Sequence, residues 1–116
     1  MSRRGEVLLW GAQRFSAMVL ALCVVVHLLT MIYAVRSGLS AAEILGRTQG
    51  SVMWFVFYTL FVFAVAIHAP IGLRTIISET FNWRGRRLDV LTGVIGLSLA
   101  MWGMRAVFGV FGAGAA

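Results

Sequence analysis

The sequence contains two histidines, His27 and His68, and each lies inside a long apolar stretch. Stretches of about 20 apolar residues are long enough to cross a membrane as helices. An ionisable side chain costs free energy inside a membrane, so its presence there is by default a hypothesis for a functional site. We therefore expect the two imidazoles to bind a ligand or carry protons, in preference to a purely structural role.

Helical spacing places each histidine on a stripe of small and polar residues, because positions three and four residues apart line one side of a helix. The stripe of the first stretch is Ser16, Leu20, Cys23, His27, Thr30 and Ala34. The stripe of the second is Ala64, His68, Gly72, Thr75 and Glu79. The small neighbours of His68 either leave space around its imidazole or allow another helix to pack closely. Spacing alone does not choose between these interpretations.

A haem group is the ligand that these histidines suit best. A metal ion held only by protein would need more histidine, cysteine or carboxylate ligands than the apolar stretches supply. A haem needs only one or two axial ligands, and its flat apolar ring fits a groove between helices. Its propionate groups would pair with cations at the membrane edge, where Arg14 and Arg74 are available. We therefore predict haem b between helices.

Composition and apolar runs predict an all-α integral membrane protein. Of the 116 residues, 60% are hydrophobic and only 12% are charged, which excludes a soluble globular domain and a disordered tail. We expect a bundle of three transmembrane helices at about residues 15–35, 52–73 and 90–110. They form a single transmembrane domain over residues 1–116. The arginines flank apolar runs and form no hydrophilic stripe, so we expect no nucleic-acid partner.

The basic residues, all of them arginines, predict how the chain is oriented. Those of the N-terminal arm and of the loop between the second and third spans are Arg3, Arg4, Arg14, Arg74, Arg84, Arg86 and Arg87. Those on the opposite side are Arg36, Arg47 and Arg105. Because basic residues accumulate on the cytoplasmic side of a membrane, we predict a cytoplasmic N-terminus and a C-terminus outside.

The two histidines have different expected depths. Counted from the cytoplasmic ends of their spans, His27 lies about 20 Å deep and His68 about 10 Å deep at the helical rise. A haem that stands along the membrane normal is ligated on both faces at one level, so these histidines should not hold the same haem. Either each pairs with a histidine of another chain, or only one of them is a ligand.

Two segments resemble the membrane-anchor cytochrome b subunits of succinate dehydrogenases and fumarate reductases. The first is WGAQRFSA at residues 10–17, which leads to His27, and the second is HAPIGLR at residues 68–74, which leads to Glu79. In that family, an arginine- and serine-containing start of the first helix contributes to a quinone site. An H-A-x-x-G motif in the second helix supplies a haem b ligand. The three-span layout also matches, so the resemblance covers nearly the whole chain.

Carried over residue by residue, the resemblance implies a set of cofactor and quinone contacts. His68 looks like an axial haem ligand, and Gly72 like the glycine that lets the ring approach. The spacing of Gln13 and His27 is similar to that in anchors with two haems, where the histidine of the first helix is also a ligand. The residues implied at the quinone site are Arg14, Ser16 and Glu79.

The chain departs from the family pattern after the second span. Small anchors often have Asp-Tyr there, whereas this chain has Glu79-Thr80, so the resemblance does not extend to a tyrosine hydrogen bond to the quinone. The presence of His27 leaves the number of haems at one or two. Two histidines cannot fill four axial positions, so a sister anchor subunit or a second copy of the chain is also implied.

The function implied by the resemblance is that of a succinate:quinone oxidoreductase anchor in the inner membrane of a bacterium. The chain would dock a flavoprotein subunit and an iron–sulfur subunit and pass electrons between the latter and quinone, without dicarboxylate chemistry of its own. Two alternatives stay open. One is a haem b anchor of another quinone-linked dehydrogenase. The other is a non-haem subunit of a transporter or an assembly factor that uses His27 and His68 for protons.

Overall fold

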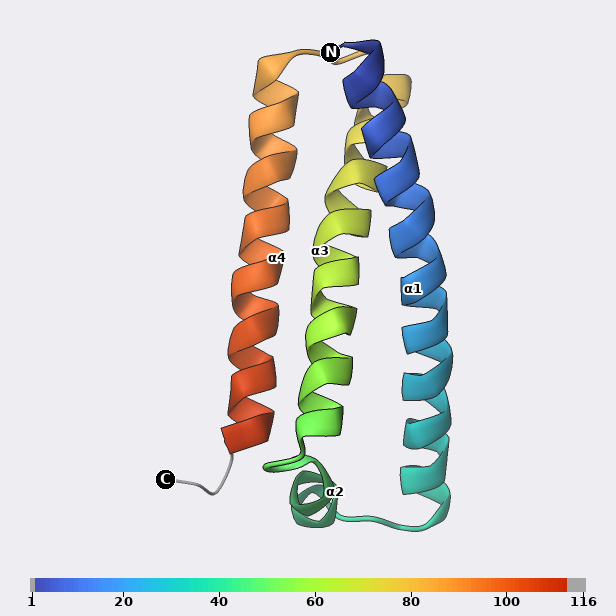
Figure 1. Cartoon of the computed structure of the whole chain (residues 1–116), viewed down its shortest axis with the longest axis vertical. Coiled ribbons are helices and arrows are strands. Elements are labelled where there is room, and N and C mark those ends of the chain that lie inside the picture. Colours follow the sequence, from blue (N-terminus) through green and yellow to red (C-terminus); the bar gives the residue numbers. More distant parts are fainter. Residues whose placement is uncertain (1, 113–116) are drawn as a thin grey trace.

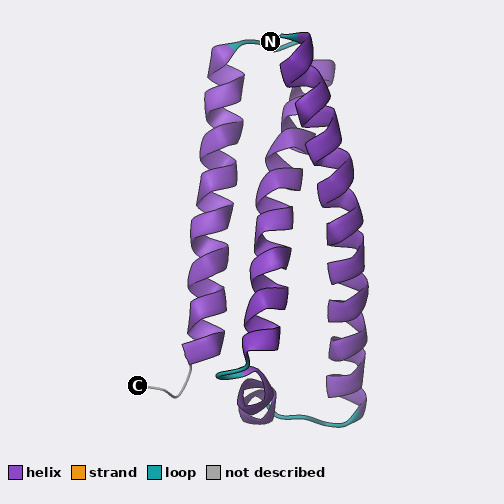
Figure 2. Ribbon diagram, viewed as in Figure 1, coloured by secondary structure: helices purple, strands orange, loops and turns teal. Residues whose placement is uncertain are grey.

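The computed structural model describes residues 2–112, which form three long helices and one short one (Figures 1 and 2). The helices are α1 (Arg3–Arg36), α2 (Ala41–Thr48), α3 (Val52–Phe81) and α4 (Arg86–Gly112). The long helices run alternately in opposite directions, and both α1 and α4 pack mainly on α3. The described residues contain no strand. The prediction of an all-α bundle of three transmembrane helices is confirmed in its helix content and number of candidate spans.

Each long helix is long and apolar enough to cross a membrane, and each contains one of the predicted spans. The helices are longer than those spans, with 34, 30 and 27 residues. At the helical rise this corresponds to about 40–50 Å, against a hydrocarbon core of about 30 Å. The excess includes polar turns such as residues 3–14 of α1 and 74–81 of α3. We therefore expect their charged residues to lie beyond the hydrocarbon when the bundle crosses a membrane.

The helix α2 lies between the first two predicted spans, in a segment where we predicted no helix. It begins with a capping box, in which Ser40 Oγ accepts from the Glu43 N–H at 3.2 Å and the Glu43 carboxylate accepts from the Ser40 N–H at 3.3 Å. These two bonds satisfy backbone donors that the first turn of a helix otherwise leaves free. The S-x-x-E pattern that makes the box was already readable in the sequence.

Two glycines and one hydrogen bond hold α2 across the end of the bundle (Figure 1). Gly38 and Gly50 flank the helix with φ of 65° and 70°, a backbone conformation that glycine adopts without steric cost. The Gly50 N–H donates to the carbonyl oxygen of Phe111 at 2.9 Å, which joins the end of α2 to the end of α4. Consequently α2 covers one end of the space between the long helices.

Close packing of α3 and α4 depends on glycines. A methyl group on Gly96 would lie 3.0 Å from the Ala66 carbonyl oxygen and 3.0 Å from Pro70 Cγ, and one on Gly103 would lie 2.5 Å from Val62 Cγ1. Pro70 has no N–H, so the Ala66 carbonyl lacks its usual helical donor, and Gly96 covers it. Small residues let helices approach closely in lipid, where apolar contact alone gives little driving force.

Few side chains of residues 2–112 are buried within the bundle. The buried apolar ones are Cys23, Ala64, Leu88 and Val107, together with Pro70, and the buried polar ones are Ser16 and Thr92. By contrast, most large apolar side chains of the long helices are exposed, as Leu22 and Trp102 illustrate. Their surface is therefore available to lipid or to another membrane subunit.

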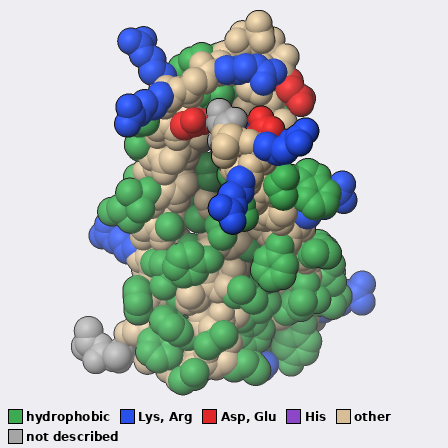
Figure 3. All heavy atoms as spheres, turned by 45° about the horizontal axis from the view of Figure 1, so that its top comes forward, with side chains coloured by type: hydrophobic (Ala, Val, Ile, Leu, Met, Phe, Trp, Pro, Cys, Tyr) green, Lys and Arg blue, Asp and Glu red, His purple; other side chains and the backbone are tan. Residues whose placement is uncertain are grey.

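Charged side chains gather at the end of the bundle where α1 begins and α3 ends (Figure 3). Hydrophobic side chains cover the sides of the bundle below them. This distribution agrees with the arginine count, and the orientation relative to the membrane stays a prediction.

We expect a substitution of Gly96 by leucine to separate α3 from α4, because no space exists for the side chain. Overpacking of this kind costs about 1–3 kcal/mol. The midpoint of thermal unfolding in detergent should fall accordingly. The matched control is Gly109→Leu, since a Cβ at Gly109 would meet nothing within 4 Å. Equal destabilisation by both variants would contradict the assignment of Gly96 to the helix interface.

We expect the N-terminus to be cytoplasmic and the C-terminus to lie outside. Alkaline phosphatase fused to the C-terminus should therefore be active, and green fluorescent protein at the same position should stay dark. The same two reporters placed in the loop after Phe81 should give the opposite result. Fluorescence of the C-terminal fusion would refute the orientation drawn from the arginines.

Candidate functional site

His27 lies on the face of α1 that is turned toward α3. Its ring centroid is 5.9 Å from that of Tyr58 and 5.7 Å from that of Phe61, at interplanar angles of 83° and 80°. These are edge-to-face contacts, which aromatic rings prefer. Tyr58 and Phe61 are three residues apart on α3 and therefore lie on the same side of it. The two rings hold the orientation of the imidazole.

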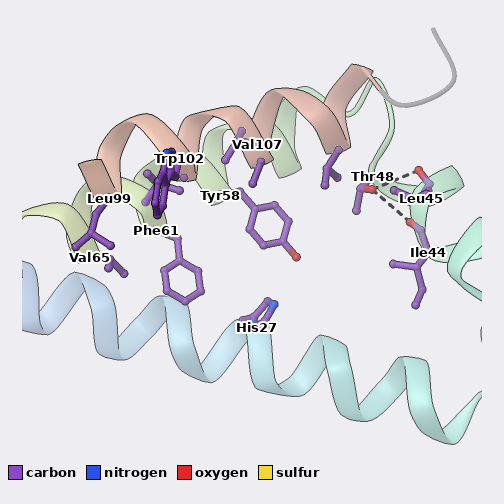
Figure 4. A pocket seen from close by; sticks show the side chains of 14 residues that line it. His27, Ile44, Leu45, Thr48, Tyr58, Phe61, Val65, Leu99, Trp102 and Val107 are labelled. Carbon is purple, nitrogen blue, oxygen red and sulfur yellow. Dashed lines mark hydrogen bonds between the residues drawn. The ribbon is translucent and has the colours of Figure 1, made fainter. Parts of the chain in front are cut away.

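The imidazole of His27 opens into a cavity between α1, α3 and α4 (Figure 4). The cavity has a volume of about 670 Å³, and α2 bounds it at one end through Ile44, Leu45 and Thr48. Its lining is almost entirely apolar, with Phe61 and Trp102 among its largest side chains. This size and apolar character are typical of sites for small molecules and cofactors.

The cavity fits a flat apolar group with one axial ligand from this chain. His27 is the only residue of α1 on its wall, so the imidazole projects alone from that side. The side chains in front of the imidazole are mostly apolar and offer few groups that could compete for it. A single imidazole that faces an apolar space suits the ligation of haem iron, which is the role that the sequence predicted for His27.

His68 is half buried on α3, and its Nδ1 atom is buried without a hydrogen-bond partner among the described residues. Buried polar atoms nearly always have a partner. A ligand, a water or another subunit can supply the partner that the described residues do not provide. This orphaned nitrogen is consistent with the predicted binding role of His68.

The register of α1 against α3 sets the relative levels of the two histidines. Gly72 lies against Gln13, and Tyr58 lies against His27. Gln13 and His27 are 14 residues apart on α1, and Tyr58 and Gly72 are 14 residues apart on α3. Equal intervals of this kind are expected for antiparallel helices that pack in a constant register. His68 is seven residues beyond Phe61 and ten beyond Tyr58, so it lies about 10–15 Å from the level of His27 along the bundle.

Gly72 faces a side chain of this chain. A methyl group on Gly72 would lie 3.2 Å from Nε2 of Gln13, and Oε1 of Gln13 is buried without a partner among the described residues. The amide thus fills the space that the sequence assigned to an approaching ring. A ring at this position would require the Gln13 side chain to turn away, so the role of Gly72 stays a prediction.

A polar cavity of about 560 Å³ lies at the opposite end of the bundle from α2. Arg14 of α1 and Arg74 of α3 both line it, so the structure brings together two arginines that the sequence assigned to cofactor and quinone contacts. Nε of Arg74 donates to Oδ1 of Asp89 at 2.6 Å, which joins the end of α3 to the start of α4. The guanidinium of Arg14 lies over the Trp10 ring at 4.8 Å.

The other two predicted quinone-site residues lie apart from this cavity. Ser16 is buried, and its hydroxyl donates to the Gln13 carbonyl oxygen of its own helix at 3.1 Å. Glu79 is exposed in the last turns of α3. Neither side chain lines the cavity, so their contribution to a quinone site stays a prediction.

Sequence reasoning missed the aromatic wall around His27. Tyr58, Phe61 and Trp102 line its cavity. The run of aromatic residues in the second span was visible, and an antiparallel pairing of the first two spans would have placed part of it beside His27. Trp102 had no such signal, because its place on the wall depends on how α4 packs on α3.

Comparison with known families gives one match. A family model described as the succinate dehydrogenase/fumarate reductase transmembrane subunit matches residues 1–104. Comparison with curated proteins and with solved structures found no match.

Proposed function

The chain belongs to the succinate dehydrogenase/fumarate reductase transmembrane subunit family, and on that premise we propose that it binds haem b and contributes to a quinone site. The observation that carries the proposal is the imidazole of His27, which projects alone into an apolar cavity between the helices. The family match supports the anchor of this enzyme over the two alternatives left open by the sequence.

His27 and His68 are the residues that would ligate haem iron. Haem b, when bound, takes up and releases one electron at a time. Tyr58 and Phe61 contact the His27 ring edge to face and favour its observed orientation, and the rest of the lining is mostly apolar. Nδ1 of His68 is buried without a partner among the described residues, so no hydrogen bond through this atom holds the side chain in place.

The separation of the histidines supports two ligation positions. They lie about 10–15 Å apart along the bundle, so one porphyrin cannot be held between them. Each position then takes its second axial ligand from another chain. The exposed apolar faces of the long helices offer surface for such a partner, whether a sister anchor or a second copy.

The quinone site is proposed at the polar cavity lined by Arg14 and Arg74. Negative charge develops on a quinone oxygen during reduction, and a positioned arginine stabilises it. Arg74 is held by Asp89, whereas Arg14 forms no ion pair within the described residues, so Arg14 is the better placed donor. Glu79 is exposed at the same end of the bundle. Ser16 is proposed at the quinone site only because residues 10–17 resemble the family.

The end that carries this cavity is also the proposed docking face for the flavoprotein and iron–sulfur subunits. It carries the loop of Trp83 and Arg84 and the start of α4 with Arg86 and Arg87. Electrons would pass between the iron–sulfur subunit and quinone at this end, in the inner membrane of a bacterium. Dicarboxylate chemistry belongs to the partner subunits in this proposal.

Purification of the affinity-tagged chain tests the assembly. We expect a flavoprotein subunit and an iron–sulfur subunit to copurify, and the complex to show the α band of low-spin b-type haem in a reduced-minus-oxidised spectrum. Copurification of both subunits without a b-type band would show that the chain is an anchor that binds no haem. A chain that binds neither haem nor these subunits would match the transporter or assembly alternative.

We expect His27→Ala and His68→Ala each to lower the haem content of the purified complex, because each removes one axial ligand. The loss should be about half where two haems are bound, as measured by the pyridine haemochromogen assay. Matched controls are Leu22→Ala and Ile67→Ala, which remove exposed apolar side chains from the same helices. Unchanged haem content in one histidine variant would remove that residue from the ligand set.

We expect Arg14→Ala to retain haem and to lose quinone reductase activity by 10-fold or more, because a charge-assisted hydrogen bond is worth about 1.5–3 kcal/mol. Electron transfer from succinate to a soluble artificial acceptor should be unaffected, since it does not use the membrane cavity. Arg36→Ala is the control at the other end of the bundle. Normal quinone reduction by the Arg14 variant would place the quinone elsewhere.

A further inference from the structure

The end of the bundle near His27 has its own cation. A hollow of about 520 Å³ adjoins the large cavity, and its walls include both His27 of α1 and Arg47 of α2. The guanidinium of Arg47 lies over the Tyr33 ring, 5.5 Å from its centroid. The two hollows share His27 and Tyr58, so Arg47 borders the space in front of the imidazole.

The charge of Arg47 has no acidic partner within residues 2–112, where the ion pair present is that of Arg74 with Asp89. Glu43, one turn earlier on α2, is used in the capping box with Ser40. An unpaired guanidinium beside an apolar cavity attracts carboxylates, which it binds with two parallel hydrogen bonds.

The position of Arg47 matches the reach of a porphyrin held by His27. Tyr33, over which the guanidinium lies, is six residues after His27, about 9 Å along the helix. The propionate arms of a haem ligated by His27 would therefore have a cation at this end of the bundle. Arg14 and Arg74 border the cavity near Gln13, which is 14 residues from His27, or about 21 Å. They are too distant to serve a group at His27.

We propose that Arg47 binds the propionate carboxylates of the haem ligated by His27, an inference that rests on the proposed haem function. The sequence-based pairing of propionates with Arg14 and Arg74 then applies only to a haem at His68. The capping box and the glycines at both ends of α2 have a role in this arrangement, since they fix the position of the helix that carries Arg47. The short helix thus forms part of the cofactor site.

The test compares the intact complex carrying Arg47→Gln, Arg47→Lys or Arg36→Gln with the wild type. Arg36 is exposed, as Arg47 is, and lies at the same end of the bundle but lines neither hollow, so its variant removes the same charge elsewhere. The measurements are haem content and a redox titration of each b-type haem. The haem at His27 is identified as the one that His27→Ala removes.

We expect Arg47→Gln to lower the midpoint potential of the His27 haem, because the neutral amide no longer offsets propionate charge when an electron is added. A tenfold change in the reduction equilibrium corresponds to 59 mV for one electron, and we expect a shift of about that size. Loss of this haem from Arg47→Gln, with retention in Arg47→Lys, would equally support the proposal. Arg47→Lys keeps the charge and should recover most of the wild-type potential.

Two results would overturn the proposal. One is an Arg47→Gln complex that titrates like Arg36→Gln and keeps its haem. The other is an Arg47→Lys complex as altered as Arg47→Gln, which would assign the effect to packing on Tyr33. A wild-type complex without b-type haem would instead overturn the proposed haem function, so the two failures are distinguishable.

Discussion

The structure depends on the close approach of α4 to α3 at Gly96 and Gly103. Lipid is as apolar as the side chains of the spans, so helices in a membrane gain little from burying leucine or valine. Contact instead requires positions where backbones can meet. Pro70 strengthens this dependence, because it leaves the Ala66 carbonyl without its helical donor and Gly96 covers that oxygen.

The cavity follows from the same constraint. Both α1 and α4 pack mainly on α3, and residues of all three helices line the space that remains between them. The helix α2 bounds that space at one end, where the Gly50 N–H donates to the Phe111 carbonyl. A bundle of three helices with so few buried side chains therefore contains a hollow large enough for a cofactor, with His27 on its wall.

The two ends of the bundle differ in the polarity of their cavities, so the arginines at each end have different surroundings. At one end, Arg74 is paired with Asp89 and Arg14 borders a polar cavity. At the other, Arg47 is unpaired within the described residues and adjoins the apolar space near His27. In the proposed function, the end with Arg14 and Arg74 binds quinone and the soluble subunits. The end with Arg47 serves the haem at His27, which lies farther from the cytoplasmic side than His68 does.

The sequence by itself determined the class, the three long helices and the candidate role of the two histidines, because these depend on local composition and helical period. It also carried the capping signal of α2 at Ser40 and Glu43. Only the tertiary structure placed Tyr58 and Phe61 beside His27, set Gln13 against Gly72, paired Arg74 with Asp89 and separated Ser16 from the polar cavity. These relations depend on the register and rotation of helices that are distant in sequence. The glycine contacts that set the packing of α4 on α3 can be recognised only when the partner helix is known.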